Sequence, residues 1–165
     1  CYLMDDRVSD VSGMISTKTW QLDRTEDNAF VHLRTQSGIM GSLHSSWTEW
    51  KGYHFCVEAY GDLGMARAYY APMSSTIITM DKPGGQAHKK RNFYIPAIFR
   101  EKFKGWQSTV VQTFVEEFHD FVSLASGGPA GAIATAEDGL RSIAIPNAVY
   151  ESDRDRNFVV LDRPG

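Results

Sequence analysis

The sequence predicts an α+β fold, with a mostly antiparallel open sheet and a pair of helices packed on one face of it. The first two-thirds of the chain is a series of short extended segments separated by turns, and the last third is helical. Strands that precede helices, rather than alternate with them, are typical of an antiparallel sheet covered by helices. The length of 165 residues suits one domain with a proper core, so we expect residues 1–165 to form a single domain.

A hairpin is the clearest element of the strand-rich part. Asp27-Asn28 marks a turn before an extended run, and Gln36-Ser37-Gly38 turns the chain into a second run over residues 39–47. Apolar and mixed faces alternate along these runs, as in a sheet covered on one side only. Further strands are predicted over residues 8–15, 53–60, 65–70, 75–80 and 158–161.

Two helices are predicted in the last third. Apolar residues recur at three- and four-residue steps from Val111 to Ala125, and Gly127-Gly128-Pro129 ends this helix. A second helix begins after Thr135, whose side chain is suited to cap its first turn. Pro146 lies within this second helix, lacks an amide donor and crowds the preceding turn, so we expect a kink or an early break there.

The segment between the strands and the helices is the least regular part of the sequence. Residues 81–91 are rich in glycine and lysine, and we expect a mobile loop there. Residues 92–105 fit either a strand or a docked irregular segment.

Composition excludes several classes of function. The formal net charge is −3 and the pI is about 5.9, so there is no electrostatic footprint for nucleic acid. No apolar run approaches the roughly 18 residues of a membrane span. Two cysteines, Cys1 and Cys56, are too few for a disulfide framework and fit a reducing compartment. We therefore expect a cytoplasmic protein that binds neither nucleic acid nor membrane.

The common catalytic and cofactor motifs are absent. The sequence has no GxGxxG, GxxxxGK[ST], GxSxG or HExxH pattern. His44 and His54 lie on neighbouring predicted strands and could approach each other, with Glu58 as the nearest third ligand. Surface or interface histidines are the favoured interpretation, so we assign no metal site and no catalytic residue.

Trp47 and Trp50 stand at the end of a predicted strand. Aromatic side chains in such a place supply flat apolar contact for a small molecule. Packing in the core or in an interface is the alternative for both residues.

Four patterns in a fixed order resemble the C-terminal domain of the Gfo/Idh/MocA oxidoreductases. They are the hairpin at residues 37–43, the E-x-x-G-x-x-G turn at residues 58–64, the F-x-x-E-F-x-x-F helix at residues 114–121, and the last helix at residues 135–152. The resemblance covers nearly the whole chain. Pro146 departs from the family pattern, in which the last helix runs uninterrupted.

The resemblance implies that catalysis belongs to a part of the protein that precedes this chain. Full-length relatives bind NAD(P) on an N-terminal Rossmann domain, which also supplies a catalytic lysine and a histidine. Cys1-Tyr2-Leu3-Met4 resembles a turn just past that histidine, although Asp5 stands where glycine is common. We therefore expect NAD or NADP in a full-length parent, no cofactor on this chain, and no activity of this chain alone.

The resemblance also implies a substrate class and a binding surface. The parent is expected to be a dehydrogenase of a sugar, polyol or related hydroxy compound. This chain is expected to contribute one wall of the substrate pocket, where Lys51 and His54 bond hydroxyl groups and the aromatic side chains stack on a sugar face. The candidate substrate-binding residues are Trp47, Trp50, Lys51, Tyr53 and His54.

Two other functions remain open. One is an assembly module, in which a mixed sheet face pairs with the same face of another copy to form a homo-oligomer. That face carries His32, Arg34, Ser42, His44, Glu58 and Tyr60. The other is a small-molecule-binding module without redox activity.

Overall fold

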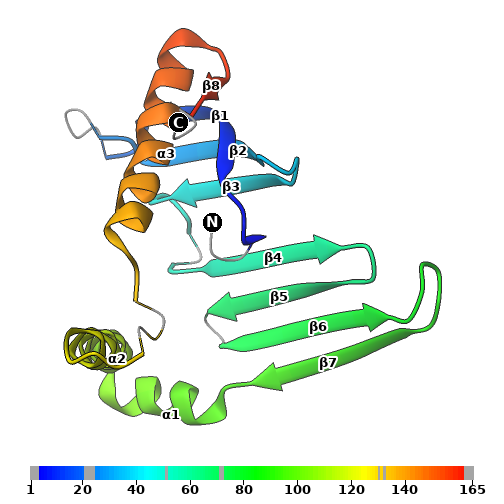
Figure 1. Cartoon of the computed structure of the whole chain (residues 1–165), viewed down its shortest axis with the longest axis vertical. Coiled ribbons are helices and arrows are strands. Elements are labelled where there is room, and N and C mark those ends of the chain that lie inside the picture. The colour runs from blue at the N-terminus through cyan, green and yellow to red at the C-terminus, as the bar shows by residue number, and fades with distance from the viewer. Residues whose placement is uncertain are drawn as a thin grey trace. The chain divides into compact units, whose positions relative to one another are not determined.

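The protein divides into two compact units, Cys1–Trp50 with Ala134–Gly165, and Lys51–Ile133. The structure, a computed structural model, describes residues 4–20, 25–50, 52–70, 73–129, 131 and 133–161. Each unit contains an antiparallel sheet and at least one helix (Figure 1), which confirms the α+β prediction. The strands are shared between two four-stranded sheets instead of one. The expectation of a single domain stays a prediction.

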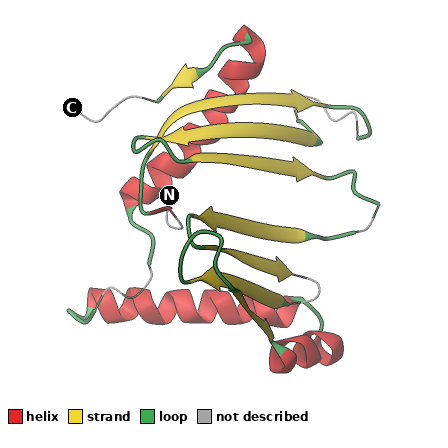
Figure 2. Ribbon diagram, turned by 90° about the vertical axis from the view of Figure 1, so that its right-hand side faces the viewer, coloured by secondary structure: helices red, strands yellow, loops and turns green. Residues whose placement is uncertain are grey.

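The first unit consists of a four-stranded sheet in the order β3-β2-β1-β8 and the helix α3 that lies across one face of it (Figure 2). The predicted hairpin is confirmed as β2 and β3, and the closing strand as β8. The elements are β1 (Val8–Ser16), β2 (Asn28–Thr35), β3 (Met40–Ser46), α3 (Ala136–Asp155) and β8 (Val159–Val160).

The core of this unit lies between β1, β2 and α3. Val11 is fully buried, and Val31, Ala148 and Val149 are nearly so. The Ser152 hydroxyl accepts a hydrogen bond from the Gly13 amide at 3.0 Å and donates one to the Asn157 carbonyl at 2.7 Å. Because both ends of this polar contact are satisfied, α3 is fixed on β1 without an unpaired buried group.

A buried carboxylate holds the chain at the entry to β2. The amides of Lys18, Thr19 and Trp20 all donate to Asp27 Oδ2, at 2.9, 2.6 and 3.3 Å. Hydrogen bonds to the ionised form favour it, so these amides, with Thr19 first, lower the pKa of Asp27 to about 2.

The sequence predicts a kink or an early break at Pro146. Helix α3 continues through this residue, so the early break is wrong, and the kink stays a prediction. Proline removes one intrahelical hydrogen bond. Directly after that position the helix is stabilised by packing on the sheet, where Ala148 and Val149 are buried in the core. Thr135 caps its start, as predicted. Packing and capping at the two sides of Pro146 therefore outweigh the lost bond.

The second unit contains a four-stranded sheet in the order β4-β5-β6-β7 and two helices. Its β7 strand corrects the expectation of a mobile loop over residues 81–91, since it pairs with β6 in regular register. The elements are β4 (Phe55–Gly61), β5 (Gly64–Tyr70), β6 (Ser74–Met80), β7 (Ala87–Phe93), α1 (Ile95–Lys104) and α2 (Gln107–Ala125).

The β7 strand has a physical reason for its unusual composition. It lies at the edge of its sheet, and edge strands often carry charged side chains, which discourage pairing with another chain. Its residues Lys89, Lys90 and Arg91 therefore hide the apolar alternation by which a strand is recognised.

The helices of the second unit follow one another along the chain. α1 forms from the segment that the sequence left open, α2 begins three residues after α1 ends, and neither helix contains a buried residue. The Tyr70 hydroxyl on β5 donates to Glu101 Oε1 on α1 at 2.6 Å, and this bond raises the pKa of Tyr70 to about 12. Among the described residues, no helix is long and apolar enough to cross a membrane.

Candidate functional site

A groove of about 660 Å³ lies in the first unit, beside α3. Its floor on the helix side comes from Leu140, Ala144 and Ala148, which recur every four residues and therefore share one face of α3. Val159 and Leu161 supply the opposite apolar side from β8 and the residue after it. The remaining lining residues are Arg7, Val8, Gln36, Glu137, Arg141, Ile145, Asn147, Glu151 and Val160.

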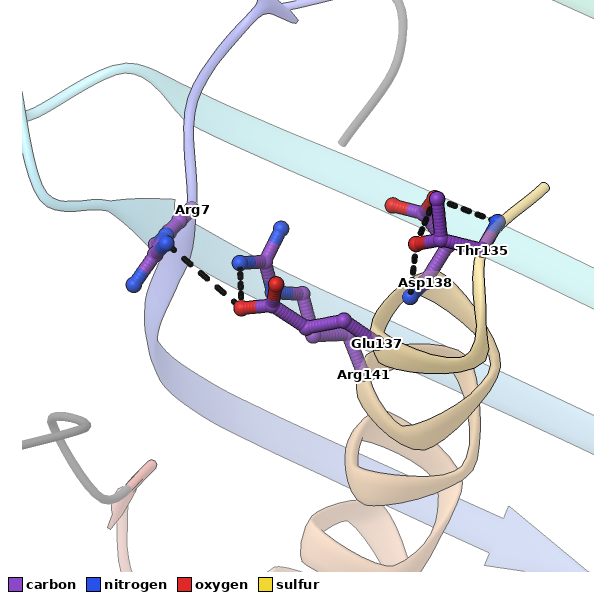
Figure 3. Close-up of polar contacts among 5 residues, drawn as sticks. All are labelled: Arg7, Thr135, Glu137, Asp138 and Arg141. Atoms are coloured by element: carbon purple, nitrogen blue, oxygen red, sulfur yellow. Dashed lines mark hydrogen bonds and ion pairs between the residues drawn. The ribbon is translucent and has the colours of Figure 1, made fainter. Parts of the chain in front are cut away.

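A charged cluster forms the rim of this groove near the start of α3 (Figure 3). Arg141 pairs with Glu137 one helical turn earlier, and Arg7 Nη2 lies 3.6 Å from the same Glu137 oxygen, Oε1. The side chains of Arg7, Glu137 and Arg141 are 44%, 60% and 38% exposed. Two guanidinium groups therefore share one carboxylate, and the Asp138 carboxylate also interacts with Arg141.

The start of α3 is fixed by a capping box. The Asp138 amide donates to Thr135 Oγ1 at 3.2 Å, and the Thr135 amide donates back to Asp138 Oδ2 at 2.9 Å. The Thr135 hydroxyl also donates to Asp138 Oδ2 at 2.6 Å, and this bond is the main reason why the pKa of Asp138 is lowered. The box places Glu137 in the first turn, so the rim of the groove has a defined position.

Two of the predicted substrate-binding residues belong to the first unit and are strongly exposed. Trp47 is 78% exposed, and its carbonyl accepts a hydrogen bond from Trp20 Nε1 at 3.4 Å. Trp50 has a fully exposed side chain. Neither tryptophan is part of the apolar core, which excludes core packing as their role.

Two other predicted residues belong to the second unit. Tyr53 packs edge-on against Tyr70, with 5.3 Å between ring centroids, and His54 packs against Tyr69 at 5.4 Å. These contacts orient both rings beside β5. Lys51 lies outside the described residues. The role of all five residues in binding a substrate stays a prediction.

The histidines and carboxylates of the described residues form no metal-binding group of three ligands. His44 stacks on Phe30, with 4.1 Å between ring centroids. Glu58 accepts a hydrogen bond from the Tyr60 hydroxyl at 2.5 Å and pairs with Arg67 on the neighbouring strand. The Tyr60 bond is the largest contribution to the lowered pKa of Glu58. Glu58 is thus engaged in a cross-strand cluster.

The described residues do not fit a dinucleotide. Every strand pair among them is antiparallel, whereas the phosphate-binding loop of a Rossmann domain joins a strand to a helix in a parallel βαβ unit. The capped start of α3 also carries Glu137 and Asp138, which repel a phosphate.

Comparison with known proteins identifies the family that this chain resembles. Residues 1–67 match the family model for the GFO/IDH/MocA C-terminal domain. The resemblance to the Gfo/Idh/MocA C-terminal domain is thus confirmed over residues 1–67. A comparison with curated proteins finds none that is similar in sequence to this chain.

Solved structures of dehydrogenases and oxidoreductases share the fold. An oxidoreductase domain protein from Kribbella flavida is 16% identical with a TM-score of 0.76, over 98% of this chain and 46% of its own. Levoglucosan dehydrogenase, in complex with NADH and levoglucosan, is 18% identical with a TM-score of 0.72, over 95% and 46%. The WlbA dehydrogenase from Bordetella pertussis, in complex with NADH and UDP-GlcNAcA, is 18% identical with a TM-score of 0.60, over 95% and 40%. The chain thus spans less than half of each of these structures.

Sequence reasoning missed the arginines of the groove and of the cross-strand cluster. The i,i+4 spacing of Glu137 and Arg141 is a signal for a pair on α3. Arg67 stands opposite Glu58 in the β4–β5 hairpin, so its pairing follows from the position of the Gly61–Gly64 turn. Arg7 offers no such signal, because it meets Glu137 only through the packing of α3 on β1.

Proposed function

We propose that this chain is the C-terminal domain of an NAD(P)-dependent oxidoreductase that acts on a sugar, polyol or related hydroxy compound. The fold shared with the levoglucosan and WlbA dehydrogenases over 95% of the chain supports the proposal. The structure of levoglucosan dehydrogenase is a complex with NADH and levoglucosan, and that of the WlbA dehydrogenase is a complex with NADH and UDP-GlcNAcA. In the proposed parent, the nicotinamide cofactor supplies hydride transfer and is bound outside the residues described above.

The contribution proposed for this chain is one wall of the substrate pocket. Tyr53, in the second unit, offers exposed aromatic surface, which suits the apolar face of a sugar ring. His54 is held against Tyr69, and its imidazole is suited to exchange a hydrogen bond with a substrate hydroxyl. On their own these groups bind and orient a substrate without reducing or oxidising it.

The coding sequence upstream of Cys1 and the kinetics of the full-length protein test this function. A strand–GxGxxG–helix unit with a Glu-Lys-Pro stretch is expected upstream. In that protein, His54→Asn should raise KM for the hydroxy substrate up to about tenfold, the equivalent of one hydrogen bond. His88→Asn, on the edge strand β7, is the matched control and should leave KM unchanged. Absence of NAD(P)-dependent turnover with sugars and polyols would refute the proposal.

We also propose that the open face of the first sheet joins two copies of the protein. Opposite α3, this face carries the exposed apolar side chains of Met14, Phe30 and Met40, at 64%, 48% and 78% exposure. Burial of such a patch against its own copy is a common way to form a homodimer.

Light scattering tests the proposed dimer. The wild-type protein should have the mass of a dimer, and Met40→Glu should convert it to a monomer. Leu43→Glu is the control, since Leu43 lies on the same strand, is 54% exposed and faces the other side of the sheet. A wild-type protein that stays monomeric at all accessible concentrations contradicts the interface.

A further inference from the structure

One face of the second sheet brings aromatic side chains and a carboxylate together at one end of its strands. Phe55, the first residue of β4, stands opposite Tyr70, the last residue of β5, so their side chains share a face. The Tyr53 ring meets the Tyr70 ring edge-on, with 5.3 Å between centroids. The Tyr70 hydroxyl donates to Glu101 Oε1 on α1 at 2.6 Å. Tyr70 therefore connects the aromatic surface of Tyr53 to the carboxylate of Glu101.

A pair of hydroxyl groups extends this surface across the sheet. Ser75 on β6 stands opposite Ala68 on β5, which lies two residues before Tyr70, so Ser75 lies on the Tyr70 face. The hydroxyl oxygens of Ser75 and Tyr94 are 3.2 Å apart. The Tyr94 amide donates to the Met73 carbonyl at 3.2 Å, which holds the start of α1 at this end of the sheet. We call this surface the tyrosine face; its residues are Tyr53, Phe55, Tyr70, Ser75, Tyr94 and Glu101, all in the second unit.

The tyrosine face presents ring surface beside hydrogen-bonding groups. Tyr53 and Tyr94 are 74% and 50% exposed. A carboxylate has about four lone-pair sites, and Tyr70 occupies one of those on Glu101. In the Ser75–Tyr94 pair one hydroxyl donates to the other, which leaves one O–H group of the pair to donate elsewhere. The surface thus combines an aromatic platform with acceptors and a donor.

The ring form of a sugar matches these properties together. One side of such a ring carries C–H groups that pack on an aromatic side chain, and its edge carries hydroxyl groups that both donate and accept hydrogen bonds. An open-chain polyol has the same hydroxyl groups but no fixed apolar side, and it loses more conformational freedom when it binds. A purely apolar partner would remove water from the Glu101 carboxylate without replacing its hydrogen bonds, which costs free energy.

We propose that the tyrosine face binds sugars and prefers the ring form over an open-chain polyol, with Tyr53 stacking on the ring and Glu101 accepting hydrogen bonds from its hydroxyl groups. Tyr70 is a positioning residue, because its hydroxyl holds Glu101 and its ring supports Tyr53. The inference rests on the proposed function for its substrate class and narrows that class to cyclic sugars. The surface is open and the ligand small, so the expected Kd is on the order of 10 mM.

Titration of the protein with methyl β-glucopyranoside, a sugar locked in the ring form, tests this surface through the NMR signals of the tyrosine rings. The glycoside should shift the signals of Tyr53 and Tyr94, and sorbitol should bind at least about fivefold more weakly. Tyr53→Ala should weaken glycoside binding about tenfold through the loss of stacking. Tyr60→Ala is the matched control and should leave the affinity unchanged. Tyr60 is also on β4 and 70% exposed, but it faces the other side of the sheet.

Glu101→Gln and Tyr70→Phe separate a binding role from a purely structural one. Glutamine keeps an oxygen that can accept from Tyr70 but lacks the charge, so its hydrogen bonds to the sugar are weaker. Tyr70→Phe keeps the ring beside Tyr53 but releases Glu101. Each change should weaken glycoside binding about threefold. The two effects should not add in the double variant, because Tyr70 acts through Glu101. A structural role alone would lower the urea midpoint and leave the affinity unchanged.

Two results overturn the proposal. One is sorbitol binding as tightly as the glycoside, and the other is equal affinity of Tyr53→Ala and Tyr60→Ala. Circular dichroism establishes that each variant is folded, and Glu101→Gln provides the test where Tyr53→Ala does not fold. The proposed oxidoreductase function fails in a different way: the full-length protein would then lack NAD(P)-dependent turnover of sugars, while the glycoside would still shift the Tyr53 signals.

Discussion

The contact of Gly13 with Val149 allows a quantitative test of how α3 packs on β1. A β-carbon added at Gly13 would lie 2.7 Å from Val149 Cγ1 and 3.3 Å from the Phe30 carbonyl oxygen. Val149 is 5% exposed and belongs to the core, so it has little room to move. Overpacking of this kind costs about 1–3 kcal/mol. The lower freedom of alanine in the unfolded chain returns about 0.4–1 kcal/mol, so we expect Gly13→Ala to lower the free energy of unfolding by about 1–2 kcal/mol.

Truncation of the partner side chain should reverse the effect. Val149→Ala removes two buried carbons, about 1.6 kcal/mol at 0.8 per carbon, and the cavity brings the total to about 2–3 kcal/mol. In the double variant, the Cγ1 atom that would clash is gone and the new methyl group of Gly13→Ala occupies part of the cavity. The double variant should therefore be no less stable than Val149→Ala alone, which corresponds to a coupling energy of about 1–2 kcal/mol.

Urea unfolding of the four proteins, followed by circular dichroism, measures this cycle. The hydrogen bond from the Gly13 amide to Ser152 involves backbone at residue 13 and is present in all four. The slope of the transition should be the same for each, so that midpoints compare directly. Additivity of the two single changes within about 0.5 kcal/mol would refute the packing that we describe between β1 and α3.

Three further predictions concern single residues. Gly64→Ala should destabilise the second unit by about 3 kcal/mol or more in urea unfolding, because its β-carbon would lie 2.0 Å from the Ile78 carbonyl oxygen. In the control Gly61→Ala the nearest atom lies at 4.0 Å, so this change should cost under about 1 kcal/mol. Equal effects of the two changes would contradict the pairing of β5 with β6. Gly139→Ala should raise stability by about 0.5–1 kcal/mol in thermal unfolding, since the site is helical and open; a loss would contradict it. The folded-state pKa of Asp27, about 2, lies below its ordinary 3.8, so ionised Asp27 stabilises the fold above pH 4, and this stabilisation is lost toward pH 2. The urea midpoint of Asp27→Asn should therefore fall less than that of the wild type as the pH is lowered. Parallel curves of urea midpoint against pH for the two proteins would refute this prediction.

The sequence correctly predicted the elements whose structure is decided by residues close together in the chain. The β2–β3 hairpin has its turn residues between two alternating runs, and Thr135 stands three residues before the carboxylate that completes its capping box. Residues within four positions of each other decide these features, so no knowledge of the packing is needed. The β7 strand lacks such a signal, because its position at the sheet edge permits charged residues on both faces.

The same difference between local and long-range contacts applies to the residues of the candidate sites. Glu137 and Arg141 are one turn apart, and a pair between them follows from helical geometry alone. Arg7 lies 130 residues before Glu137, and only the packing of β1 against α3 brings the two side chains together. A cluster that depends on such a long-range contact could not be found by spacing. Trp47 and Trp50 are candidates because of their place at the end of a strand, and their role in binding stays a prediction.

Helix α3 makes the stability of the first unit and the geometry of the groove depend on the same element. One part of its surface buries Val149 in the core, and the adjacent face lines the groove with Leu140 and Ala144. The helix is fixed at its start by the capping box and near its end by Ser152, so both contacts support the face that lines the groove. The effect of an α3 variant on the groove is therefore informative only beside its free energy of unfolding. Arg7 reaches the same groove from the residue before β1 and pairs with Glu137, so the rim joins this strand to the start of α3.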